Sequence, residues 1–146
     1  MPAGALDVGG GAVSARATAA PGEAADETLD RRVIAQFREV DTPGTPDFSL
    51  MLIDEFIKET ASQLERLGDA RQRQDVRALK AIAHSLKGSS MTMGARRLAT
   101  LCTQVETHAD RHPGGAVMSA LMTELGQEFV KVLEALEAER KGSSQL

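Results

Sequence analysis

The sequence predicts an all-α protein, an antiparallel four-helix bundle with a short extra capping helix on its N-terminal side. Apolar residues recur at helical spacing from residue 29 to residue 141, and no stretch shows the alternation that is typical of a strand. Short connections rich in Gly, Pro or Asp interrupt this pattern. No internal repeat of solenoid length is visible, which argues against a stacked-repeat architecture.

Length and composition limit the function classes. The 146 residues suffice for one domain, and a hydrophobic fraction of 42% with 26% charged residues is ordinary for a soluble chain. No apolar run is long enough to span a bilayer and no signal peptide is visible, so we expect a cytoplasmic protein without direct membrane contact. One cysteine excludes an intramolecular disulfide and a Cys-rich metal site. A net charge of −4 and an aromatic set of four Phe argue against nucleic acid as a partner.

Three segments follow from the composition. Residues 1–25 are rich in Ala and Gly and predict a flexible tail or linker, residues 26–141 predict the bundle, and residues 142–146 predict a disordered end. A linker would suit the cytoplasmic C-terminal module of a longer, membrane-anchored protein, but a free-standing protein fits as well. We expect a monomer, because the bundle can bury its own apolar faces.

The first two helices precede residue 73. The first spans residues 29–40 and the second begins near Pro46, with Thr45 as its N-cap. The second helix ends either at Gly68 or near Gln72, the longer form placing a glycine inside the helix at a cost of about 1 kcal/mol. The inward apolar residues are Leu29, Val33, Ile34 and Phe37, then Phe48, Leu52, Ile53, Phe56, Ile57, Leu64 and Leu67.

Three more helices complete the bundle. The third runs from the N-cap Asp75 to about Met93, the fourth over residues 95–111, and the fifth over residues 116–141, after the break at residues 112–115. Their inward residues are Leu79, Ile82, Leu86 and Met93; Leu98, Leu101, Cys102, Val105 and Ala109; and Met118, Leu121, Met122, Leu125, Phe129, Val132, Leu133 and Leu136. Most methionines are predicted to fill the core, with Met91 the exception.

The third helix carries the most informative surface. With His84 set at 0°, the apolar residues of this helix lie within about 40° of the opposite side. His84 is therefore predicted to face solvent, in a stripe formed by Arg77, Lys80, His84, Lys87 and Gly88. Residues 76–105 contain five basic residues and no acidic one, which predicts a local positive surface suited to an acidic partner or a phosphoryl group.

The run His84-Ser85-Leu86-Lys87-Gly88-Ser89-Ser90, followed by Gly94 and Leu98, resembles the motif of histidine-containing phosphotransfer (HPt) domains. The resemblance covers residues 29–141 and includes the order of the helices. One position departs from the commoner bacterial pattern, because Gln74 stands where that pattern has a Gly before Asp75. This departure affects only where the second helix ends.

The resemblance implies a phosphorelay carrier in a two-component system, which accepts a phosphoryl group from the aspartate of one response-regulator receiver domain and passes it to another receiver. His84 would be the phosphoacceptor, Lys87 its charge partner and Gly88 the clearance for the receiver, with the small Ser89 and Ser90 beside it. Lys87 could instead be a plain surface lysine, and Gly88 could permit close helix packing. The resemblance implies no cofactor on this chain, and Mg²⁺ is expected on the partner receiver.

Further candidates are expected to contact the partner, namely Arg77, Lys80, Met91, Arg96 and Arg97. For Arg96 and Arg97 receiver docking and a solvated turn are equally supported. His108 and His112 have the spacing of metal ligands on one helix face, but nothing completes a site, so no metal is expected. Glu106, on the fourth helix, could approach the His84 region from the neighbouring helix but is assigned no role.

Two other functions stay open. One is a phosphoacceptor bundle of the chemotaxis-kinase type, fed directly by an ATP-dependent kinase domain, and the other is a helical adaptor with a degenerate site. The sequence contains no Gly-rich phosphate loop and no Walker or kinase motif, so the chain itself is predicted not to be an enzyme. A parent chain could still be a hybrid sensor histidine kinase.

Overall fold

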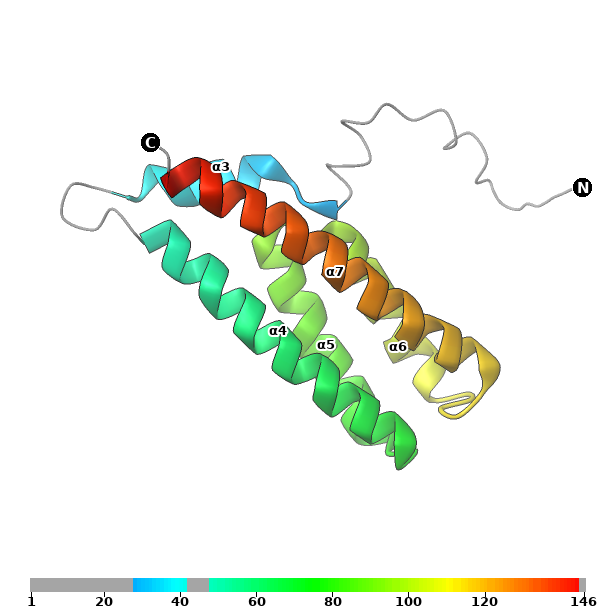
Figure 1. Ribbon diagram of the computed structural model, residues 1–146. Coiled ribbons are helices and arrows are strands. Elements are labelled where there is room, and N and C mark those ends of the chain that lie inside the picture. The colour runs from blue at the N-terminus through cyan, green and yellow to red at the C-terminus, as the bar shows by residue number, and fades with distance from the viewer. Residues whose placement is uncertain (1–27, 42–47, 145–146) are drawn as a thin grey trace, which may run out of the picture.

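Five helices make up the described part of the chain, residues 28–41 and 48–144 of a computed structural model. They are α3 (Arg31–Glu39), α4 (Phe48–Gln72), α5 (Val76–Met93), α6 (Arg96–Ala109) and α7 (Ala116–Ser144). The four long helices run up and down as a bundle, and α3 lies at the end where α4 begins and α7 ends (Figure 1). The predicted all-α bundle with its extra helix is confirmed. The expected tail at residues 1–25 and the helix start at Thr45 and Pro46 lie outside the described residues.

The helix ends differ from the predictions by a few residues. Helix α4 continues through Gly68 to Gln72, and a Cβ added at Gly68 would meet nothing within 4 Å. Helix α6 ends at Ala109, two residues before the expected end. Helix α7 runs to Ser144 rather than ending at Lys141, where a frayed tail was expected. Propensity alone places helix ends poorly, because packing against the bundle extends or shortens the last turn.

The ends of α4 and α5 close with the same backbone motif. The amides of Asp75 and Ala95 donate to the carbonyls of Ala70 and Ser90, five residues back, at 2.9 and 2.8 Å. This pattern needs a left-handed residue just before the donor. Gly94 fills that position in α5 with a φ of 86°, whereas in α4 the residue is Gln74 with a φ of 53°. The departure noted in the sequence therefore retains the motif and places a side chain in a conformation that glycine adopts more easily.

The core lies between the four long helices. Helix α5 packs mainly against α4 and α6, and α7 packs against α4 and α6 from the other side, so the outer face of α5 stays uncovered. Most of the predicted inward residues are buried, but Phe48 is 40% exposed and Met51, a further exception among the methionines, is 64% exposed. The largest fully buried side chains are Leu29, Ile34, Ile53, Leu67, Leu79, Leu86, Leu98, Met118, Leu125, Leu136, Val105 and Val132.

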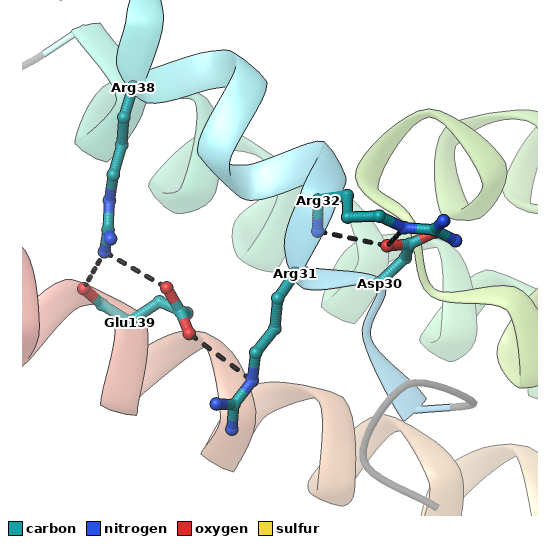
Figure 2. Close-up of polar contacts among 5 residues, drawn as sticks. All are labelled: Asp30, Arg31, Arg32, Arg38 and Glu139. Atoms are coloured by element: carbon teal, nitrogen blue, oxygen red, sulfur yellow. Dashed lines mark hydrogen bonds and ion pairs between the residues drawn. The ribbon is translucent and has the colours of Figure 1, made fainter. Parts of the chain in front are cut away.

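Helix α3 closes one end of the bundle. The Asp30 amide donates to the Gly94 carbonyl at 2.8 Å. A Cβ on Gly94 would come within 3.1 Å of Asp30 and Val33, so the absence of a side chain at Gly94 allows α3 to pack against the α5–α6 turn. On the other side, Arg38 donates to the backbone carbonyl of Glu139 at 2.6 Å and pairs with its carboxylate at 3.1 Å (Figure 2). The contacts tie α3 to both α5 and α7.

None of the helices in residues 28–41 and 48–144 has both the length and the apolar content that a membrane span requires.

Candidate functional site

His84 lies in the middle of α5, on the face that no other helix covers. Its side chain is 69% exposed. On the opposite side of the helix Leu79 and Leu86 are fully buried, as the periodicity requires when one face joins the core. The prediction that His84 points to solvent is confirmed.

The Glu106 carboxylate of α6 lies next to one nitrogen of the imidazole. Its Oε2 lies 3.3 Å from Nδ1 of His84, and its side chain is 28% exposed. The negative charge of a carboxylate beside Nδ1 favours a proton on that nitrogen, so this contact favours the Nδ1-protonated tautomer. Nε2 then carries the free lone pair and is the nitrogen that can act as a nucleophile.

The lysines that flank His84 differ in their surroundings. Lys80, one turn before His84, pairs with Asp110 at 2.8 Å, and this hydrogen bond, with the Asp110 charge, raises the pKa of Lys80. Lys87, almost one turn after His84, is half-buried and forms no ion pair within the described residues. Lys87 is thus the lysine beside His84 whose ammonium is available to a phosphoryl group.

Gly88 leaves an open surface next to His84. A Cβ added there would meet nothing within 4 Å, so close helix packing does not require this glycine and that alternative is disfavoured. Of the neighbouring small residues, Ser89 is half-buried with its hydroxyl donating to the carbonyl of Leu86 at 3.2 Å, and Ser90 is fully buried. Gly88 therefore forms the open surface beside His84, and the buried Ser90 does not contribute to it.

Arg97 has a partner within the bundle. Its Nε lies 3.3 Å from Oε1 of Glu128 on α7, whose side chain is only 2% exposed. A buried carboxylate needs a cation or donors beside it, which explains an arginine in the first turn of α6, where the helix dipole disfavours it. This pairing favours a structural role for Arg97 over docking. Arg96 is exposed at the start of the same helix.

Replacing Arg97 by Met is expected to lower the free energy of unfolding by about 1–3 kcal/mol, because it removes the cation from a buried carboxylate. The rate of phosphoryl transfer should equal the wild-type rate within experimental error. Urea unfolding and a transfer assay measure the two quantities on one preparation. A slower transfer at unchanged stability would instead assign Arg97 to docking.

The burial and neighbours of the remaining candidate residues indicate what each can do. Cys102 is fully buried in the core, and burial raises the pKa of its thiol to about 12. Within the described residues no group of three or more His, Cys, Asp or Glu side chains is placed to hold a metal. His108 is half-buried and His112 is exposed in the α6–α7 turn. Arg77 and Met91 lie exposed on the face of His84, the latter by 61%.

The acidic side chains that face this site do not follow from the sequence prediction. It assigns no role to Glu106 and does not include the pairing of Asp110 with Lys80. A signal existed, since Lys80 and His84 are four residues apart on one helix and Glu106 and Asp110 are four apart on the next. Two antiparallel helices bring such pairs opposite each other, but only the bundle packing gives the register.

An exposed histidine on the outer face of a four-helix bundle, with a lysine and an open glycine beside it, defines a histidine phosphotransfer class of domain. Residues 51–139 match the family described as Hpt domain, and the chain belongs to that family. It is a phosphotransfer carrier of two-component phosphorelay signalling.

Individual relatives agree with this assignment. The chain is 34% identical to histidine-containing phosphotransfer protein B (HptB) from Pseudomonas aeruginosa PAO1, with a TM-score of 0.70 over 84% of this chain and 97% of that structure. The HPT domain of a sensor hybrid histidine kinase from Shewanella shares the fold, at 20% identity and a TM-score of 0.60 over 83% of this chain and 97% of that structure. Multistep phosphorelay regulator 1 of Schizosaccharomyces pombe is 21% identical over 71% of this chain, and the match spans 35% of that protein.

Proposed function

We propose that His84 is the phosphoacceptor and that it carries a phosphoryl group between the aspartates of two receiver domains. The observation that carries this proposal is the His84 imidazole itself, 69% exposed on the uncovered face of α5 with the Glu106 carboxylate 3.3 Å from its Nδ1. No other histidine in the described residues has both a carboxylate within 4 Å and an open neighbouring surface.

The transfer step follows from this geometry. The lone pair of Nε2 attacks the phosphorus of a receiver's aspartyl phosphate, an N–P bond forms, and the O–P bond breaks with its electron pair left on the aspartate carboxylate. The Nδ1 proton stays on the ring, which becomes cationic as the bond forms. The Glu106 carboxylate at 3.3 Å stabilises that charge. The reverse step on a second receiver restores the neutral ring.

The surface around His84 supplies the remaining contributions. The Lys87 ammonium compensates the charge of the transferred group, and Gly88 leaves room for the receiver to approach the imidazole. Arg77 and Met91, on the same face of α5, extend the contact surface along the helix in both directions. Ser89, Lys80 and Arg96 border this surface.

The proposed partners are response-regulator receiver domains, which would bring their own Mg²⁺ and acidic pocket. The chain would act as a monomer in the cytoplasm, free-standing or as one module of a hybrid sensor histidine kinase. A tether to a receiver in the same chain would raise its effective concentration to about millimolar.

The function is tested by charging a purified receiver domain with a small phosphodonor and Mg²⁺ and then adding this protein. We expect an acid-labile, base-stable label to move from the receiver to this protein, and from it to a second receiver. A histidine-kinase catalytic domain with ATP, offered without any receiver, should label it poorly. Efficient labelling in that second arm alone would favour a kinase-fed bundle, and no labelling by several charged receivers would favour an adaptor.

A further inference from the structure

Two cross-helix pairs lie next to each other on the α5–α6 surface. Lys80 pairs with Asp110 at 2.8 Å, and one turn further along α5 His84 contacts Glu106 at 3.3 Å. Within the described residues Asp110 faces Lys80 alone, whereas Glu106 lies beside His84 and also acts electrostatically on Lys80. Glu106 is the carboxylate for which Lys80 and His84 can compete.

The Lys80 ammonium is within electrostatic range of both carboxylates. Its pKa is raised first by the Asp110 hydrogen bond and charge, and the Glu106 charge adds a smaller contribution. A lysine side chain is long and rotates freely, so an ammonium that loses Asp110 can turn toward the next carboxylate one helical turn away. An ammonium is also a stronger partner for a carboxylate than a neutral imidazole.

The position of Asp110 indicates that this residue has a specific role. Asp110 is the C-cap residue of α6, where the helix dipole disfavours a negative charge. Its side chain is 60% exposed, so it contributes nothing to the core. An acidic residue at such a site weakens the helix slightly, and among the residues that the structure describes its side chain pairs with the Lys80 ammonium.

We propose that Asp110 is a positioning residue that acts through Lys80: it holds the ammonium away from Glu106, so that the Glu106 charge stays directed at Nδ1 of His84. This inference rests on the proposed function and adds to it a second pair of residues that sets the imidazole tautomer. When Asp110 is lost, the Lys80 ammonium pairs with the Glu106 carboxylate, and His84 shifts toward the tautomer with its proton on Nε2. That tautomer has no lone pair on Nε2 and cannot attack the phosphoryl group.

The test replaces Asp110 by Asn and records the ¹⁵N resonances of the His84 ring together with the rate of phosphoryl transfer from a charged receiver. We expect the Nδ1-protonated form to lose population in Asp110→Asn and the rate to fall several-fold. Folding is not at risk, since the substitution removes an unfavourable charge at a helix end. Glu124→Gln, which removes one exposed negative charge from α7, is the matched control and should change neither quantity.

A double-mutant cycle separates this mechanism from a general charge effect. In the Lys80→Met background no ammonium can move to Glu106, so adding Asp110→Asn should leave the tautomer and the rate as they are in Lys80→Met alone. An equal loss in both backgrounds, or no change of tautomer in Asp110→Asn, would overturn the inference. The proposed function fails separately, through a His84→Gln variant that still becomes phosphorylated.

Discussion

A His84→Gln variant is expected to acquire no acid-labile label from a charged receiver, whereas the wild type becomes labelled. Glutamine fills similar space and remains polar, but it has no nucleophilic nitrogen. The His84 side chain is 69% exposed, so the substitution should leave the free energy of unfolding within about 0.5 kcal/mol of the wild type. Label incorporation, followed over time on gels kept at neutral pH, measures the effect.

The matched control for this experiment is His112→Gln, which removes another exposed histidine, in the α6–α7 turn. It should become labelled at the rate of the wild type. Label that persists in His84→Gln, or disappears in His112→Gln, would place the phosphoacceptor elsewhere.

The second large effect concerns Gly88, where stability and transfer should change in opposite directions. Gly88→Ala is expected to raise the free energy of unfolding by about 1 kcal/mol, because alanine favours the helix and a Cβ there meets nothing within 4 Å. Transfer should slow, and a longer side chain in Gly88→Leu should slow it about tenfold or more, since a steric cost of about 1.4 kcal/mol lowers affinity tenfold. Urea unfolding and transfer rates at low receiver concentration measure both effects.

Gly126→Ala provides the control for Gly88→Ala. Gly126 also lies inside a helix with nothing within 4 Å of an added Cβ, but it belongs to α7, across the bundle from the outer face of α5. It should gain similar stability with no change in transfer. If Gly88→Leu transfers as fast as the wild type, the receiver does not approach over this glycine.

Local sequence patterns are enough to predict the helices and the face of α5 that is exposed to water. Hydrophobic spacing needs only the helical period, so Leu79, Leu86 and His84 could be assigned to opposite sides without a partner helix. Asp75 and Gly94 are local signals of the same kind, because a side-chain cap and a left-handed residue act within a few positions along the chain.

Local patterns do not predict which side chains meet between α5 and α6, or between α6 and α7. The register between antiparallel helices depends on how their apolar side chains interlock, which no local pattern specifies. In this register Glu106 lies beside Nδ1 of His84 and Asp110 pairs with Lys80. It also places Arg97 next to the buried Glu128. Of the two lysines in the positive stripe predicted from the sequence, Lys80 pairs with Asp110, whereas Lys87 forms no ion pair within the described residues.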